Sequence, residues 1–435
     1  MSSSSSALRQ IGIYRNLPTF DESVEGLTAI ITGANGISGF NTMRALLDSP
    51  KRWKTIFCLS RRPPPEEMMN LLSADARSRI EIVTCDFLDE PASIAKSMKE
   101  AGVRADHIFY YSYIHKLWTD VDGLVESNVA LLKNFLVALE LADIKPTRFI
   151  LQTGGKSHGV HIGRGRTPLL ESDPQPRHLQ PNFYYPQEDL LRAFCEKYGT
   201  AWNIIMPCAI IGSSSQAGMN MFYLFGIYAA VQARKGEPLI FGGDWEAWQY
   251  ETYHGSARMT GYLTEWAALN KDCANENFNA QDGGPLVWER FFPELARWFG
   301  VEKVVPPPDD ESGLETKISG QSGKKAPLGY GPPFSSKTRF TLADWAKEEE
   351  NAAAWREIMK ESGGKITNDP FADPEAFSMS EYAYLRAGSP CMNKAKRLGW
   401  TGFVDTTESL FETFKELGEL GLLPPMKVDS ARPMC

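Results

Sequence analysis

The sequence has few cysteines and no excess of basic residues. Its seven cysteines form an odd number and include no CxxC pair, which argues against a disulfide framework and against a zinc cluster. Lys and Arg number 46 against 54 Asp and Glu, so the net charge is −8. A chain with this charge is poorly suited to a nucleic-acid backbone. We therefore expect a protein of a reducing compartment that binds neither a metal nor nucleic acid.

Long hydrophobic runs and targeting signals are also lacking. The longest apolar stretch covers residues 219–231, well short of the roughly 20 residues that span a bilayer. The serine-rich residues 1–6 have neither the basic nor the apolar region of a secretory signal. These observations predict a buried helix over 219–231, a flexible tail and lead-in over 1–23, a cytoplasmic location and no membrane partner.

The chain does contain a regular alternation of short β-branched runs and amphipathic helical stretches between about residues 25 and 210. This pattern predicts an α/β fold with a doubly wound parallel Rossmann-type sheet. An apolar stripe indicates a helix over 128–142, for example. The expected strands, each followed by Gly, Pro or polar residues, are 28–32, 55–60, 80–85, 107–111, 148–152 and 202–206.

A glycine-rich turn separates the first of these strands from the helical stretch after it. Gly33, Gly36 and Gly39 have the spacing G-x2-G-x2-G. The first permits a tight turn, the second lets the backbone approach a pyrophosphate, and the third allows close packing of helix on strand. A turn without a ligand has the same composition, but the flanking strand and helix favour a dinucleotide site. That site would also include Thr32, Asn35 and Ile37.

The end of the second strand indicates which dinucleotide is preferred. NAD-binding folds usually carry an acid there, whereas this chain has Ser60-Arg61-Arg62. Two guanidinium groups would bind a 2′-phosphate and so favour NADP, unless they are simply solvated surface arginines. Asp86 is expected to touch the adenine, although it is equally suited to cap a helix. The other expected cofactor-binding residues are Phe87, Tyr111 and Pro207.

The composition changes after residue 206, where an apolar stretch, an aromatic run at 241–253 and mostly helical sequence follow. This change indicates a second, smaller and mostly helical lobe for the substrate. The Pro- and Gly-rich residues 306–334 are expected to form a loop or insertion. The expected division is an NADP-binding Rossmann domain over 24–206 with a returning segment near 238–283, and a substrate-binding lobe over 207–237 and 284–435.

The candidate catalytic residues do not have the usual spacing. Reductases of the short-chain type commonly place a lysine four residues after a tyrosine, and no tyrosine of this chain has one there. Tyr184 and Tyr185 are instead followed at that distance by Glu188 and Asp189. Lys156, which follows the fifth strand at the edge where open α/β sheets bind ligands, is a lysine that can replace the missing one.

The missing lysine and its replacement after the fifth strand match the pattern of a known family. The sequence resembles the progesterone 5β-reductase/iridoid synthase-like (PRISE-like) family of extended short-chain dehydrogenases/reductases over about residues 27 to 405. The resemblance implies that Tyr184 and Lys156 are the catalytic pair and that Tyr185 is a packing residue. The matching motifs are Thr153-Gly154-Gly155-Lys156, Asn182-Phe183-Tyr184-Tyr185 with Glu188-Asp189, Arg61-Arg62, Phe109-Tyr110, Asn275 to Asn279, Cys391 to Lys396 and Gly399 to Phe403.

The chain also departs from the family pattern. Ser157-His158 stands where His-Tyr is expected, and Met206-Pro207 stands where Arg-Pro is expected. These positions are expected near the nicotinamide or the substrate, so the pocket shape and the reaction direction can differ from those of the family. His158 and His161 are either extra proton donors or hydrogen-bonded bystanders.

The favoured reaction is NADPH-dependent 1,4-reduction of the activated C=C bond of an enone or enal. Tyr184 would stabilise the enolate oxygen, while the Lys156 ammonium would lower the tyrosine pKa from about 10 and anchor the nicotinamide ribose. The 219–231 stretch, with Trp245 and Trp248, would either suit a large lipophilic substrate, such as one of secondary metabolism, or form part of the core. A carbonyl reductase or epimerase/dehydratase of the same fold is the first alternative, and a non-catalytic NADP-sensing scaffold is the second. The expected assembly is a homodimer.

Overall fold

A computed structural model describes residues 8–116, 120–215 and 220–431 of the 435-residue chain. Within these residues a central sheet has the strand order β12-β8-β7-β6-β3-β4-β5, and every neighbouring pair is parallel. Strand order reverses between β3 and β6, the point at which open α/β sheets bind ligands. The predicted doubly wound Rossmann-type sheet is confirmed. Its strands are β3 (Leu27–Thr32), β4 (Trp53–Ser60), β5 (Ile80–Thr84), β6 (His107–Tyr110), β7 (Arg148–Gln152), β8 (Ala201–Pro207) and β12 (Glu276–Ala280).

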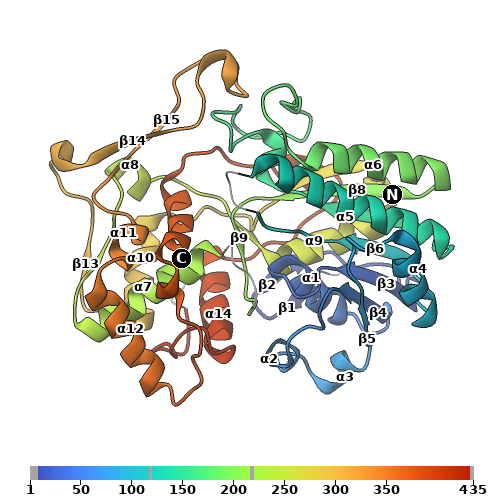
Figure 1. Cartoon of the computed structure of the whole chain (residues 1–435), viewed down its shortest axis with the longest axis horizontal. Helices are drawn as coiled ribbons and strands as arrows, with labels where there is room; N and C mark the ends of the chain where they lie inside the picture. Colours follow the sequence, from blue (N-terminus) through green and yellow to red (C-terminus); the bar gives the residue numbers. More distant parts are fainter. Residues whose placement is uncertain (1–7, 117–119, 216–219, 432–435) are drawn as a thin grey trace.

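Helices cover both faces of this sheet (Figure 1). Consecutive strand residues point to opposite faces, so Ile31 packs with α1 (Ile37–Leu47) and α9 (Ala257–Leu269). Ile30 packs with α4 (Pro91–Glu100), α5 (Val121–Leu141) and α6 (Tyr184–Tyr198). Because both faces are covered, the strands read as nearly continuous apolar runs in the sequence.

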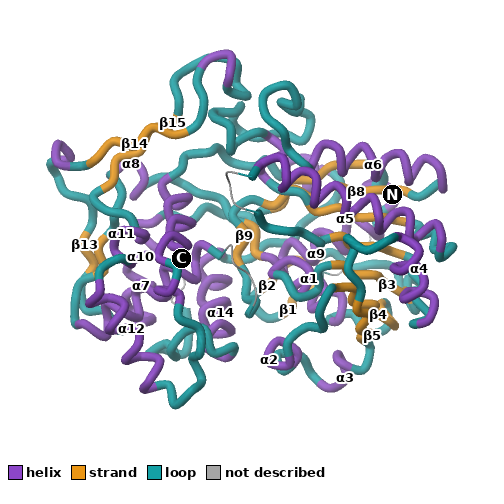
Figure 2. Tube along the Cα trace, viewed as in Figure 1, coloured by secondary structure: helices purple, strands orange, loops and turns teal. Residues whose placement is uncertain are grey.

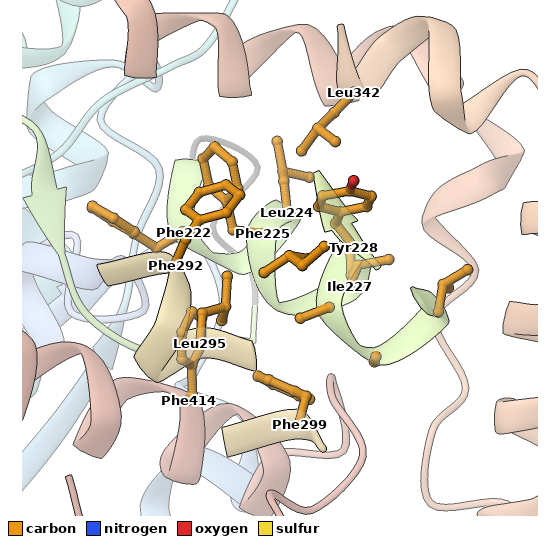
Figure 3. Close-up of a cluster of buried hydrophobic side chains, with 14 of the residues drawn as sticks. Phe222, Leu224, Phe225, Ile227, Tyr228, Phe292, Leu295, Phe299, Leu342 and Phe414 are labelled. Carbon is orange, nitrogen blue, oxygen red and sulfur yellow. The ribbon is translucent and has the colours of Figure 1, made fainter. Parts of the chain in front are cut away.

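A mostly helical part lies beside the sheet, on the left of Figure 2, where purple helices predominate. Its core includes Phe222, Phe225 and Tyr228 of α7 (Met221–Lys235), which pack near Phe292 and Leu295 of α10 (Trp288–Phe299), as Figure 3 shows. Other elements here are α8 (Trp245–Trp248), α11 (Leu342–Ala346), α12 (Glu349–Glu361), η6 (Pro374–Tyr384) and α14 (Thr406–Glu419).

The helix expected over 219–231 is α7, which begins at Met221; residue 219 lies outside the described residues. This helix and the neighbouring tryptophans were expected either to contact a lipophilic substrate or to belong to the hydrophobic core, and the structure favours the core. Trp248 is 4% exposed and packs 4.9 Å from Phe241, ring centroid to ring centroid. Trp245 is half-buried, and its indole N–H donates to the carbonyl of Pro308 at 3.1 Å. No helix among the described residues is both long enough and apolar enough to cross a bilayer.

Within the tail and lead-in expected over 1–23, residues 9–17 contain regular structure, while residues 1–7 lie outside the described part. β1 (Arg9–Ile11) and β2 (Tyr14–Leu17) pair antiparallel. Arg9 forms an ion pair with buried Glu265 at 3.1 Å, and the Tyr14 ring lies 5.2 Å from that of Tyr262. These partners on α9 hold the hairpin on the molecule.

The 306–334 segment contains more regular structure than a simple loop. β14 (Glu315–Ser319) pairs antiparallel with β15 (Phe334–Thr338), and the chain between them includes η4 (Gly323–Lys325). The hairpin extends along the upper edge of the molecule in Figure 1. The remaining elements are α2 (Glu66–Met69), α3 (Ala74–Arg77), η1 (Gly155–His158), β9 (Ile210–Ile211), β10 (Leu239–Ile240), β11 (Gly255–Ser256), η2 (Lys271–Cys273), β13 (Val304–Val305), η3 (Glu311–Gly313), η5 (Pro370–Ala372) and α13 (Asn393–Arg397).

Candidate active site

The glycine turn after β3 has the geometry that its sequence predicts. Gly33 has φ +64°, and a Cβ there would lie 2.8 Å from the carbonyl oxygen of Tyr111. A Cβ on Gly39 would collide with the carbonyl oxygen of Gly33. Gly36 is the N-cap of α1, and no side chain caps the first turn of that helix. An uncapped helix N-terminus behind a tight glycine turn is suited to a pyrophosphate.

Thr32 fastens this turn to the neighbouring strand. Its hydroxyl accepts hydrogen bonds from the backbone N–H groups of Tyr111 (3.0 Å) and Ser112 (3.2 Å), which follow β6. The Tyr111 hydroxyl accepts a bond from Thr42 of α1 at 2.9 Å, while burial raises the pKa of Tyr111 to about 12. Thr32 and Tyr111 therefore hold β3, β6 and α1 together at the switch point, and a direct contact with a cofactor stays a prediction for both.

The arginine pair lies beside the glycine turn. The Asn35 amide donates to the backbone carbonyl of Arg62 at 2.8 Å, and the Ser60 hydroxyl donates to the same oxygen at 2.6 Å. The side chains of Arg61 and Arg62 are exposed. Asn35 and Ser60 thus fix the backbone of this pair and leave both guanidinium groups accessible to an anion.

The two residues after β5 have different environments. The Asp86 carboxylate accepts a hydrogen bond from the Leu88 N–H at 2.9 Å. It therefore closes a local turn, since α4 begins at Pro91 with Glu90 as its N-cap. Phe87 is 3% exposed, and its ring packs 4.7 Å from that of Phe135 in the core. A cofactor contact of Phe87 is therefore restricted to its backbone.

Tyr184 and Lys156 are joined through Asn182. The Asn182 amide donates to the Lys156 carbonyl at 2.9 Å, and its carbonyl oxygen accepts from the Tyr184 N–H at 3.1 Å. Tyr184 is the first residue of α6, and Lys156 belongs to η1, directly after β7. In the sequence Asn182 is visible only as part of a motif, and its position two residues before Tyr184 is the signal for a positioning role.

The phenol of Tyr184 lies at the C-terminal edge of the sheet. A Cβ on Gly154 would be 3.3 Å from the Tyr184 hydroxyl and 3.2 Å from the carbonyl oxygen of Pro207. Gln152, at the end of β7, donates to the Ser38 hydroxyl at 2.7 Å in the first turn of α1. Tyr184 and the glycine turn therefore flank the same strand ends, which is the arrangement that the sequence predicts for a dinucleotide and a substrate.

Burial changes the acidity of both candidate catalytic groups. It raises the pKa of Tyr184 well above its usual value of about 10, and the neighbouring Tyr113 and Cys208 add to the effect. Burial lowers the pKa of Lys156 to about 8. Removal from water therefore dominates the acidity of Tyr184, and a lowering of the tyrosine pKa by Lys156 stays a prediction. Tyr184 is protonated at neutral pH and can donate a hydrogen bond.

Tyr185 has a different environment from Tyr184. It is 4% exposed, and its hydroxyl donates to the Ser157 carbonyl at 3.3 Å. The guanidinium of Arg177 lies 5.2 Å from its ring centroid. Glu188, where a lysine is usual, is fully buried and accepts from the Gln175 amide at 3.0 Å. These contacts make both residues part of the packing around α6.

The two histidines after Lys156 also differ. Nε2 of His158 lies 2.9 Å from the side-chain oxygen of Asn279 in β12, so His158 links the loop to the sheet. Burial and the charge of Lys156 lower the pKa of His161 to about 4. Within the described ranges, no group of at least three His, Cys, Asp or Glu side chains is arranged to hold a metal ion.

Residues 29–319 match the family described as a PRISE-like Rossmann-fold domain. A short chain dehydrogenase, gsfE, of Penicillium aethiopicum is 30% identical over 91% of this chain and 99% of its own. The (S)-8-oxocitronellyl enol synthase CYC2 of Camptotheca acuminata is 28% identical, and the 3-oxo-Delta(4,5)-steroid 5-beta-reductase of Arabidopsis thaliana is 26% identical. Each of these two alignments covers 91% of this chain and 93% of the relative. The chain belongs to the PRISE-like Rossmann-fold family.

Proposed function

We propose that this protein is an NADPH-dependent reductase that acts on the activated C=C bond of an enone or enal in a lipophilic substrate. The observation that carries the proposal is the protonated phenol of Tyr184 over Gly154, beside the strand ends that carry the glycine turn. The Arabidopsis thaliana relative supports the choice of bond, since its name describes the reduction of a 3-oxo-Delta(4,5)-steroid. A carbon–carbon double bond next to a ketone is an enone.

The residues at the switch point fit NADP. Gly33 and Gly39 allow the close backbone packing that forms the turn, and a pyrophosphate would bind against the N-terminus of α1 behind Gly36. The exposed guanidinium groups of Arg61 and Arg62 stand where the 2′-phosphate would be bound. NADPH, when bound, supplies a hydride to the substrate.

The protein contributes polar groups at the substrate oxygen. Tyr184 donates a hydrogen bond to the carbonyl oxygen, and this bond strengthens as negative charge develops there. Lys156 is charged below a pH of about 8 and stabilises the same negative charge electrostatically. One oxygen-directed donor is sufficient for 1,4-reduction, because the α-carbon can take its proton from solvent once the enolate has formed.

Paired substitutions test the role of Tyr184. Tyr184→Phe removes a hydrogen bond made mainly in the transition state, so kcat for a panel of enones should fall about 100-fold, and the dissociation constant of NADPH should change little. Tyr185→Phe removes only the bond to the Ser157 carbonyl and should have a much smaller effect. NADPH consumption gives kcat, and fluorescence titration gives NADPH affinity. A larger loss from Tyr185→Phe would show that the motif is assigned one residue out of register.

A further inference from the structure

The loop after Lys156 carries a buried nitrogen whose hydrogen-bonding capacity is unused. Nδ1 of His161 is inaccessible to solvent, and none of the residues that the structure describes hydrogen-bonds it. Buried side-chain polar atoms nearly always have a hydrogen-bond partner, because leaving one without a partner destabilises the folded protein. The absence of a partner for Nδ1 of His161 among the described residues therefore needs an explanation.

The chain fold brings His161 back toward Lys156. Gly159 follows η1 with φ +77°, and its N–H donates to the Lys156 carbonyl at 3.0 Å. Ile162 N–H then donates to the Gly159 carbonyl at 2.8 Å, which closes a second turn around His161. The charge of Lys156 contributes to keeping the imidazole neutral. A neutral imidazole has one donor and one acceptor nitrogen, so it can bond either a carbonyl or a hydroxyl group.

The 320–334 segment fixes this loop from outside. Gln321 N–H donates to the Ile162 carbonyl at 2.6 Å, and Leu328 N–H donates to the Arg164 carbonyl at 2.8 Å. A Cβ on Gly163 would lie 2.6 Å from the Gln321 carbonyl oxygen, so the two backbones are in close contact. The backbone that follows His161 is thereby held in place against this segment.

A comparison with two other histidines shows what is particular to His161. Nδ1 of His107 is also without a partner among the described residues, but that ring lies inside the sheet, 5.4 Å from the Trp53 ring. His158 is bonded to Asn279. Of these three, His161 alone combines an unused nitrogen with a position next to the candidate catalytic lysine.

We propose that His161 is a ligand-binding residue of this site, and that Nδ1 of its imidazole hydrogen-bonds a hydroxyl or carbonyl oxygen of a molecule bound beside Lys156. The choice of molecule rests on the proposed function. The oxygen belongs either to the enone substrate or to the ribose of NADPH. Both sources offer the same chemistry, so the experiment must separate them.

Two amide substitutions distinguish the ring nitrogens. His161→Asn places an amide near the position of Nδ1, whereas His161→Gln places it near that of Nε2. We expect His161→Gln to weaken binding of one ligand about tenfold and His161→Asn to stay within about threefold of the unmodified protein. His178→Gln, at an exposed histidine upstream of Tyr184, is the matched control and should change nothing. The measurements are the dissociation constant of NADPH, KM for a cyclic enone, and the melting temperature.

The outcome identifies the ligand. A rise in the NADPH dissociation constant assigns the bond to the ribose, and a rise in KM alone assigns it to the substrate. Unchanged values for both ligands in folded His161→Gln would overturn the proposal, as would equal losses in the Asn and Gln variants. If the unmodified protein reduces no enone, the proposed function fails separately. NADPH titration then decides about His161, and an unaffected dissociation constant overturns its role.

Discussion

At the residue scale, burial favours the neutral forms of both candidate catalytic side chains. It keeps Tyr184 protonated and lowers the pKa of Lys156 to about 8. Tyr184 is therefore a hydrogen-bond donor throughout the neutral range. Lys156, in contrast, loses its charge within an accessible range of pH, so the two residues can be separated by a pH profile.

We predict that kcat/KM falls as the pH rises through about 8 in the unmodified protein. The pKa of Lys156 is lowered, so its charged form is present below that pH and disappears above it. Lys156→Arg keeps the charge at all accessible pH values and should move this decline above a pH of about 10. Rates measured between pH 6 and 10 provide the test. A decline at the same pH in Lys156→Arg would assign it to another group.

The cofactor preference depends on two other residues. Arg61→Ala combined with Arg62→Ala should weaken NADPH at least about tenfold, because charge-assisted hydrogen bonds contribute roughly 1.5–3 kcal/mol each. NADH lacks the 2′-phosphate, so its use should change much less. Apparent KM values for both cofactors check this prediction. Equal use of NADPH and NADH by the unmodified protein would contradict it.

At the element scale, the sequence predicted the βαβ part well and the later elements poorly. The six expected strands all occur, with ends that agree within about two residues, because their apolar runs lie between two helical layers. The pattern does not predict β12 as a strand, because Glu276, Asn277 and Asn279 interrupt its apolar run. The structure explains Asn279, whose amide donates to the carbonyls of Leu169 and Cys391.

The site shows the same division. A local motif predicts the glycine turn, and the family resemblance implies the pair Tyr184 and Lys156, whose neighbourhood follows from the sheet order. The contact between loop 159–164 and segment 320–334 joins residues more than 150 positions apart. No local pattern predicts such a pairing. The N-terminal hairpin was missed for a similar reason, as its partners are on α9.

Gly163 provides an element-scale test of the contact with segment 320–334. Gly163→Ala places a Cβ 2.6 Å from the Gln321 carbonyl oxygen, so the two backbones must separate. We expect kcat/KM for enones to fall several-fold, which is about the effect of losing one hydrogen bond. The affinity for NADPH should be unchanged. Gly313→Ala is the control, because a Cβ at Gly313, in η3 shortly before this segment, would meet nothing within 4 Å. Identical kinetics for the two variants would contradict a role for this contact.

At the scale of the whole molecule, the helical part is tied to the helix that follows the glycine turn. Arg44 of α1 donates to both carboxylate oxygens of Glu416 in α14, at 2.9 and 2.6 Å. Burial opposes ionisation of Glu416, but Arg44 keeps its pKa below the usual value. The ion pair therefore connects α1, which follows the glycine turn, to α14, whose Phe414 belongs to the helical core of Figure 3.

The arrangement of the site does not distinguish the candidate reactions. Their products do. A carbonyl reductase and an epimerase of this fold would use the same glycine turn and the same tyrosine and lysine. A protein that only senses NADP would bind the cofactor without turnover. The candidate reactions differ in the carbon atom that receives the hydride.

Location of the transferred label is the most direct test of the central claim. With deuterated NADPH and a cyclic enone, we predict deuterium on the β-carbon of a product whose carbonyl group is intact. Deuterium on a carbinol carbon would contradict the claim and assign the protein as a carbonyl reductase. Conversion of a substrate without net NADPH oxidation would indicate an epimerase, and tight NADPH binding without any labelled product would indicate a scaffold.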